Sequence, residues 1–242
     1  MLLFDIGNSR IKWQKSHNFS ESPNAFTYNR EDLTSQLEVN FNECDKPAQD
    51  VVIVSVAGEV INLQIERWIK QRWGVGVRFL HSETQWGALH NGYENAEMLG
   101  ADRWYALVGA VSNYAYPLVV CDIGSAVTID IVDKTGTHLG GYITPGFEMM
   151  IRSLNSNTDI NIRPEQFNGE IGLIPNNTNS AVGEGCLRAI ASLIDSINMG
   201  VGANNAILTG GGAEKIISLV NSESIIDKNL IFYGIERVIE AP

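Results

Sequence analysis

The sequence predicts an α/β protein of two related lobes, each a mixed β-sheet flanked by helices. A strand–turn–strand pattern occurs twice, as "LFDIGNSRIK" at 3–12 and "VCDIGSAVTI" at 120–129. Segments with helical spacing of apolar residues lie between short apolar runs that are typical of strands. The 242 residues are enough for one large domain or two small ones. Because the repeat offset is close to half the chain, we expect lobes at 1–115 and 116–242.

The first lobe begins with the first copy of the repeat, which predicts two strands joined by a tight turn. The run "DVVIVSVAG" is almost unbroken in its apolar character, as expected for a strand that is covered on both faces. The next segment carries one apolar stripe and ends at Gly74, which predicts a helix. The polar stretch 14–50 is expected to be mostly surface loop. The expected elements are strands at 2–7, 10–16, 24–29 and 50–58 and a helix at 58–74.

The second lobe begins in the same way. After the second copy of the repeat, the predicted turn "KTGT" at 134–137 separates two alternating runs. A long segment that is apolar on one face and followed by Gly200 predicts a helix. The run "NAILTGGGA" predicts a strand that ends in three glycines. The expected elements are helices at 101–114, 180–200 and 213–221 and strands at 120–124, 127–133, 138–146 and 205–213.

Composition and charge narrow the function classes. The net charge is −11 and lysines and arginines form no cluster, which disfavours binding to nucleic acid or to an anionic membrane surface. The first residues lack the basic region of a signal peptide, and no run approaches the ~20 apolar residues of a membrane span. The cysteines are scattered, and the histidines lack metal-binding spacing, so we expect a cytoplasmic protein with reduced thiols. The three cysteines are Cys44, Cys121 and Cys186.

The pattern D-x-G-N-S-x-x-K at 5–12 combines groups that suit a phosphate. A turn of small residues lets backbone N–H groups approach an anion, and Lys12 returns on the next strand with a positive charge. Asp5 ends the first strand, where it is suited to hold Mg²⁺ through water. The octapeptide alone is equally compatible with an ordinary β-hairpin and a solvated aspartate. It is not a Walker A loop, which has a different spacing.

The second copy strengthens the phosphate interpretation. Asp122 and Gly124 match Asp5 and Gly7, so two hairpins are available to clamp one polyphosphate. The glycines of "TGGGA" at 209–213 follow a strand and precede a helix, which suits close approach of a ring or ribose, although such triplets are often just flexible turns. This order of two hairpins and a glycine-rich strand end resembles the actin-like ATPase superfamily.

The segment "LGADRW" at 99–104 begins a predicted helix with Asp102 and Arg103 in its first turn. Aspartate is common in the first turn of a helix, because a carboxylate complements the helix dipole, so Asp102 has an ordinary structural explanation. An exposed arginine there is less typical, and it becomes reasonable if Arg103 faces an anionic ligand such as a carboxylate. Asp102 beside it has the chemistry to accept a proton from a substrate hydroxyl.

Together, these motifs resemble type III pantothenate kinase over nearly the whole chain, with "GGYITPGFEMM" at 140–150 and "NNT" at 176–178 as further matches. The resemblance implies two actin-like, ribonuclease H-like lobes with a nucleotide cleft between them, and a homodimer. It implies phosphorylation of pantothenate to 4'-phosphopantothenate by ATP with Mg²⁺ and a monovalent cation, K⁺ or NH₄⁺, in the first step of coenzyme A biosynthesis. The implied ATP-binding residues are Asp5, Ile6, Gly7, Asn8, Ser9, Arg10, Ile11, Lys12 and Ser125. The implied pantothenate-binding residues are Tyr93, Gly100, Ala101, Asp102, Arg103 and Thr178, with Asp102 as proton acceptor and Asp122 as the monovalent-cation ligand.

Two positions depart from that family's pattern. Ser125 stands where threonine is usual, which keeps the hydroxyl, and no proline lies between Tyr93 and Leu99, which leaves the shape of the substrate lid open. Two other functions stay open beside the kinase. One is another actin-like small-molecule kinase, although the cysteine-rich zinc motif of many sugar kinases is missing here. The other is a non-enzymatic accessory regulator, because fold alone does not determine function.

Overall fold

The computed structural model describes residues 1–164, 174–203 and 205–240 and divides into two compact units. Unit 1 comprises Met1–Asn113 and Asn229–Pro242, and unit 2 comprises Tyr114–Lys228. The first change of unit falls close to the expected boundary at residues 115 and 116. Packing groups the last helix with unit 1, however, which a division of the sequence into two consecutive lobes does not anticipate.

Unit 1 is built on a five-stranded sheet in the order β3-β2-β1-β4-β5. β1 pairs antiparallel with β2 and parallel with β4, so the carboxyl ends of β1 and β4 meet at one edge. The four strands predicted for this lobe are confirmed, and β5 is an addition. The strands are β1 Leu2–Ile6, β2 Arg10–Lys15, β3 Asn24–Thr27, β4 Val51–Ser55 and β5 Val77–Leu80, with a separate hairpin of β6 Gln85–Trp86 and β7 Leu89–His90.

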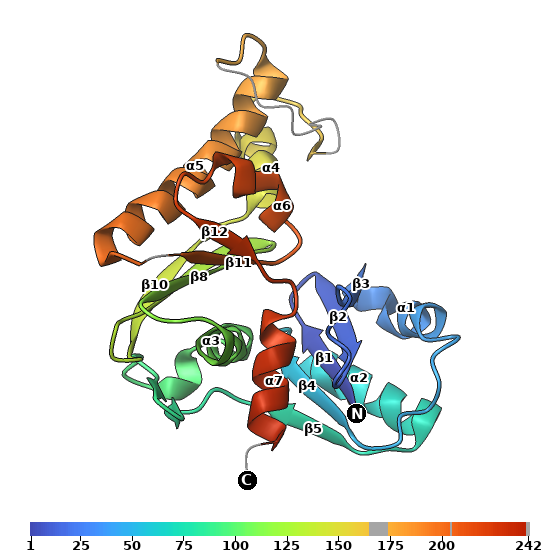
Figure 1. Cartoon of the computed structure of the whole chain (residues 1–242). Coiled ribbons are helices and arrows are strands. Elements are labelled where there is room, and N and C mark those ends of the chain that lie inside the picture. The colour runs from blue at the N-terminus through green and yellow to red at the C-terminus, as the bar shows by residue number, and fades with distance from the viewer. Residues whose placement is uncertain (165–173, 204, 241–242) are drawn as a thin grey trace. The chain divides into compact units, whose positions relative to one another are not determined.

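Helices cover both faces of this sheet (Figure 1). On one face, α1 Leu33–Asn40 and α2 Glu59–Trp73 bury apolar side chains against Phe4 and Ile53. The other face is covered by α3 Ala101–Asn113 and α7 Leu230–Glu240. Side chains alternate along a strand, so Asp5 points toward the α3 and α7 face. The predicted helix at 58–74 is confirmed, and it ends on Gly74 in the left-handed conformation with φ 63°.

α3 and α7 cross at two glycines. A Cβ atom on Gly109 would collide with the Leu230 carbonyl, and one on Gly234 would collide with the Tyr105 carbonyl. Only glycine permits this backbone approach. At its other end, α7 is tied to the turn after β2, where the backbone N–H of His17 donates to Glu236 at 2.6 Å. The C-terminal helix α7 therefore supports α3, whose first turn contains Asp102.

Unit 2 repeats the sheet of unit 1, with the strand order β10-β9-β8-β11-β12. β8 pairs antiparallel with β9 and parallel with β11, as β1 does with β2 and β4. The expected duplication of a sheet unit is therefore present in both topology and register. The strands are β8 Leu118–Ile123, β9 Ala126–Val132, β10 His138–Pro145, β11 Ala206–Thr209 and β12 Ser224–Ile226.

One face of this sheet packs against α4 Phe147–Asn157, α5 Thr178–Val201 and α6 Ala213–Ile216, which is followed by a 3₁₀ turn at Ile217–Leu219. The predicted helix at 180–200 is confirmed as α5, and it is capped by Gly202, which has φ 62°. On the opposite side, His138 and Asp130 form a buried pair at 2.8 Å between Nε2 and Oδ1. The apolar core of unit 2 lies between its sheet and the helices α4, α5 and α6.

One expectation for the elements was wrong. The stretch 14–50 contains α1, whose Leu33 and Leu37 are buried together with Phe41, a spacing of four residues that fits a helix face. The helices α4 and α7 were also missed in the sequence. In the part of the chain that the structure describes, no helix has the length and apolar character needed to cross a bilayer.

Candidate functional site

The turn between β1 and β2 lies at the carboxyl end of β1. The N–H of Gly7 donates to the Arg10 carbonyl at 3.0 Å, and Asn8, Ser9 and Arg10 are exposed. Ile6 and Ile11 are fully buried and pair with each other across the hairpin, so their side chains are not accessible to a ligand. Of the predicted ATP-binding residues in 5–12, those of the turn are accessible.

Asp5 and Lys12 contact each other. They are directly opposite in the β1–β2 register, and Lys12 Nζ lies 2.9 Å from Asp5 Oδ2. Asp5 is only 4% exposed, so this ammonium group compensates for burial of the carboxylate. The sequence predicts that Lys12 binds phosphate and that Asp5 binds Mg²⁺ through water, and the structure shows that the two side chains form an ion pair.

Two residues that the sequence did not single out hold the turn. The Tyr28 hydroxyl donates to the Gly7 carbonyl at 2.8 Å, and the Tyr28 N–H donates to the Ser9 carbonyl at 3.2 Å. Arg30 lies in the 3₁₀ turn η1 Arg30–Asp32 and donates to Asn8 Oδ1 at 3.3 Å. Both follow β3, which is far from the turn in sequence, so only the sheet pairing reveals them.

The residues predicted to bind pantothenate form a compact group at the start of α3. Arg103 Nη1 donates to the Tyr93 hydroxyl at 2.7 Å, and its guanidinium lies 5.4 Å from the centroid of the Tyr93 ring. Asp102 Oδ1 accepts the Arg103 N–H at 2.8 Å. The expectation of an exposed arginine was wrong, because Arg103 is 6% exposed. Ala101 is buried and Asp102 half-buried.

The loop after β4 connects this segment to the turn predicted to bind phosphate. The Val56 N–H donates to the Ile6 carbonyl at 2.9 Å, at the end of β1. A Cβ atom on Gly100 would lie 3.7 Å from Val56 and 2.6 Å from Asp102 Oδ1, so glycine lets the carboxylate fold back over the helix start. Ligands of open α/β sheets bind beyond the carboxyl ends of the strands. The two predicted sites of unit 1 therefore meet at one sheet edge.

In unit 2, Asp122 is half-buried and Ser125 is exposed in the turn after β8. Gly210, with φ 84°, lies so close that a Cβ atom there would collide with Asp122 Oδ1 and lie 2.6 Å from the Ile123 carbonyl oxygen. Glycine at position 210 is therefore needed for packing against the end of β8. Carboxylate and carbonyl oxygens are suitable ligands for a hard cation, so this donor set fits the predicted monovalent ion. Thr178 is exposed in the first turn of α5, whose Asn177 side chain accepts the Ser180 N–H at 3.0 Å.

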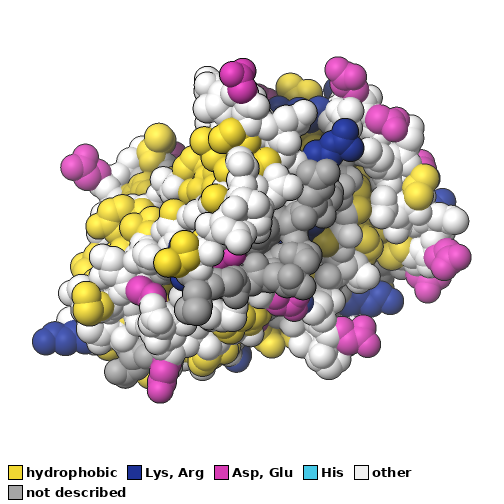
Figure 2. Space-filling model, turned by 90° about the horizontal axis from the view of Figure 1, so that it is seen from above, with side chains coloured by type: hydrophobic (Ala, Val, Ile, Leu, Met, Phe, Trp, Pro, Cys, Tyr) yellow, Lys and Arg dark blue, Asp and Glu magenta, His cyan; other side chains and the backbone are white. Residues whose placement is uncertain are grey.

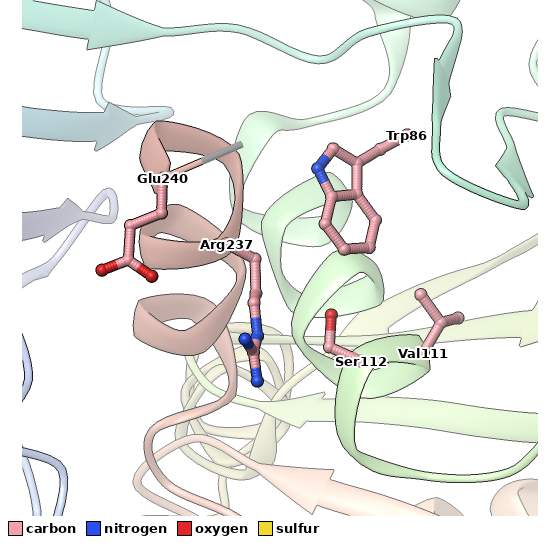
Figure 3. Close-up of a pocket in the computed structure, with 5 residues that line it drawn as sticks. All are labelled: Trp86, Val111, Ser112, Arg237 and Glu240. Atoms are coloured by element: carbon pink, nitrogen blue, oxygen red, sulfur yellow. The ribbon is translucent and has the colours of Figure 1, made fainter. Parts of the chain in front are cut away.

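A pocket of about 640 Å³ lies elsewhere in unit 1 (Figure 3). It is lined by Trp86, by Val111 and Ser112 from α3, and by Arg237 and Glu240 from α7. None of the predicted site residues lines it. The sheet edge rather than this pocket is therefore the candidate functional site.

Comparisons with known proteins identify the family. A family model described as type III pantothenate kinase matches residues 1–199. A relative from Nitrosococcus oceani with the name type III pantothenate kinase is 30% identical over 250 residues, which cover 98% of this chain and 93% of the relative.

Solved structures give the same fold. A Campylobacter jejuni protein, named for the Baf family of transcriptional activators, has a TM-score of 0.62 at 25% identity and covers 99% of this chain and 98% of that one. A glucokinase from Streptomyces griseus has a TM-score of 0.51 at 11% identity, with 98% of each chain covered, and shows the fold alone. The fold is that of actin-like ATPases and sugar kinases. The match over residues 1–199 and the near-complete coverage of a named relative establish that the chain belongs to the type III pantothenate kinase family.

Proposed function

We propose that this chain transfers the γ-phosphoryl group of ATP to the primary hydroxyl of pantothenate, the first step of coenzyme A biosynthesis. The observation that carries the proposal is the family match over residues 1–199. The geometry of unit 1 supports it, because the predicted phosphate turn and the predicted pantothenate segment adjoin the same β4 loop. Phosphoryl transfer requires mainly positioning and charge neutralisation from the protein.

The turn at Gly7–Ser9 is the proposed phosphate site of unit 1. Its exposed backbone and the Asn8 and Ser9 side chains supply hydrogen-bond donors, and Lys12 supplies a positive charge. Asp5 fits a water-mediated contact to Mg²⁺, because it ends β1 and one of its oxygens already accepts from Lys12. Bound magnesium would supply charge neutralisation on the phosphate oxygens.

Asp102 is the proposed proton acceptor. The pantothenate oxygen forms the new bond to the γ-phosphorus, the bond to the ADP oxygen breaks, and the hydroxyl proton passes to the Asp102 carboxylate. The bond from the Arg103 N–H fixes that carboxylate at the helix start. Arg103 and Tyr93, held together at 2.7 Å, would bind the polar end of pantothenate, beside the backbone of Gly100 and Ala101.

The proposed contributions of unit 2 rest on the family resemblance. Ser125 would contact ATP phosphates, Asp122 would hold K⁺ or NH₄⁺, and Thr178 would contact pantothenate in a homodimer. The proposed location is the cytoplasm, supported by three cysteines without disulfides. Gel filtration tests the dimer, and assays with and without K⁺ test the cation.

A substrate screen tests the proposed function directly. ADP release is measured with ATP and Mg²⁺ in the presence of pantothenate, glucose or N-acetylmannosamine, each with and without K⁺. We expect ADP release that depends on pantothenate only. Release with a hexose instead would favour another actin-like kinase.

The name of the Campylobacter neighbour favours a second candidate, an accessory regulator of transcription. The net charge of −11 disfavours direct binding to DNA, and lysines and arginines on the face in Figure 2 are scattered. A regulator would then act through protein partners. Absence of phosphopantothenate at millimolar ATP with Mg²⁺ and K⁺ would favour this candidate over the kinase.

A further inference from the structure

Arg30 spans the two loops that leave the adjacent strands β1 and β4. Its Nη2 atom lies 3.3 Å from Asn8 Oδ1 in the β1–β2 turn and 3.4 Å from the Ala57 carbonyl oxygen after β4. Neither partner carries a charge. The guanidinium therefore lies at the carboxyl-end edge of the sheet, beside the accessible turn, with further N–H groups left for a ligand.

The charge of Arg30 is not neutralised by a carboxylate. Among the described residues it forms no ion pair, although Glu31 and Asp32 follow it in sequence. Burial raises the pKa of the nearby Tyr28 hydroxyl, and the positive charge of Arg30 opposes that rise. Because the acceptors of Arg30 are uncharged, its positive charge is available to interact with an anion.

Unit 2 offers an internal comparison. The Gly146 N–H donates to the Ser125 carbonyl at 3.0 Å, as the Tyr28 N–H does to Ser9 in unit 1. Two residues further along the chain, unit 1 has Arg30 and unit 2 has Glu148. Glu148 pairs with Arg152 on its own helix at 2.9 Å. Of the two related turns, the one in unit 1 therefore has a cation beside it at this position.

We propose that Arg30 is a phosphate-binding residue that contacts the terminal phosphates of ATP at the Gly7–Ser9 turn. The inference rests on the proposed role of that turn as the phosphate site. Guanidinium groups present forked donors that match phosphate oxygens, and such charge-assisted bonds are stronger than neutral ones. Arg30 thereby adds to Lys12 a second positive charge on the same nucleotide.

The test measures binding of ATP, ADP and AMP by calorimetry in the full chain. Arg30→Gln keeps an amide donor near Asn8 but removes the charge, and Arg30→Lys keeps the charge without the fork. Arg67→Gln, at an exposed arginine on α2, is the matched control. We expect Arg30→Gln to weaken ATP binding roughly 10- to 100-fold and AMP binding less than threefold. Arg30→Lys should bind ATP with intermediate affinity, and Arg67→Gln should bind it like wild type.

Two further measurements separate this role from a structural one. The KM for pantothenate and the melting temperature of Arg30→Gln should stay close to wild type. ATP affinity within twofold of wild type, or an equal loss for AMP and ATP, would overturn the inference. Lys12→Met is measured in parallel: if only this variant weakens ATP binding, Arg30 alone is misassigned. If neither variant weakens it, the turn is not the phosphate site and the proposed site fails as well.

Discussion

The β1–β2 hairpin of unit 1 and the β8–β9 hairpin of unit 2 are two versions of one element. Each ends its first strand with an aspartate, an isoleucine and a glycine, and each occupies the same place in a five-stranded sheet. In both, the residue after the third strand donates its N–H to the turn. The two hairpins therefore share their sequence motif, their place in the sheet and a backbone hydrogen bond to the turn.

The differences lie in the polar groups around each turn. Asp5 is opposite Lys12, whereas Asp122 is opposite Thr128. Four residues connect the paired Ile6 and Ile11, and three connect Ile123 and Val127. The longer turn is held by side chains of Tyr28 and Arg30, and the shorter one has the backbone of Gly146 against it. The comparison shows that the two units share the sheet topology, whereas the positively charged Lys12 and Arg30 lie at the turn of unit 1.

The largest expected effect comes from Asp102, the proposed proton acceptor in unit 1. Asp102→Asn should reduce kcat roughly 10²- to 10⁴-fold, because an amide cannot accept the hydroxyl proton. Asn still offers an oxygen to the Arg103 N–H, so folding should persist. Steady-state kinetics measure the effect, and Asp133→Asn, in the turn after β9, is the control. An unchanged kcat with a raised KM would exclude Asp102 as the base.

The next prediction compares Lys12, opposite Asp5, with Thr128, opposite Asp122. Lys12→Met should lower the free energy of unfolding by roughly 1–3 kcal/mol, because it leaves the buried Asp5 without its ammonium partner. It should also raise the KM for ATP about tenfold. Thr128→Val should change the unfolding free energy by less than about 1 kcal/mol and leave the KM within twofold. Urea unfolding and kinetics measure both. Equal effects of the two variants would contradict a charge-based difference between the hairpins.

The turn of unit 1 is held by the Tyr28 side chain and that of unit 2 by close contact with the Gly146 backbone, and each can be disturbed by one substitution. In Gly146→Ala, the new Cβ atom would lie 2.6 Å from the Ser125 carbonyl oxygen and displace the turn, which should lower the unfolding free energy by roughly 1–3 kcal/mol. In Tyr28→Phe, loss of the hydroxyl bond to the Gly7 carbonyl should lower it by about 1 kcal/mol. Chemical denaturation ranks the variants. A larger effect of Tyr28→Phe would show that the side-chain bond is the more important support.

The smallest expected effect is confined to unit 2 and depends on pH. Burial would raise the pKa of Asp195, but hydrogen bonds from Ser222 and Asn221 prevail and hold the pKa below its ordinary value of 3.8. A lowered folded-state pKa contributes stability above pH 3.8 that is lost as pH falls through the folded-state pKa. Asp195→Asn should therefore be less stable than wild type at neutral pH, and the difference should shrink below pH 3.8. Thermal melts over this range measure it, and a constant difference would contradict the linkage.

Most of the sheet architecture could be predicted from the sequence, because apolar alternation and the repeated Asp-Ile-Gly directly reflect strand pairing. The helix α7 could not be assigned to unit 1, since its packing on α3 depends on two glycines far apart in sequence. Within the candidate site, residues that belong to one sequence motif, such as Asp102 and Arg103, could be identified from the sequence. Tyr28 and Arg30 escaped notice because β3 brings them to the turn, and the Lys12–Asp5 contact depends on the register of the hairpin.

The central claim is that this chain phosphorylates pantothenate with ATP. The most direct measurement incubates wild-type protein with ATP, Mg²⁺, K⁺ and pantothenate and identifies the product by phosphorus NMR and mass spectrometry. The account predicts a phosphate ester on the primary hydroxyl of pantothenate, formed in step with ADP. ADP formed without phosphopantothenate, or no turnover at all, would contradict it.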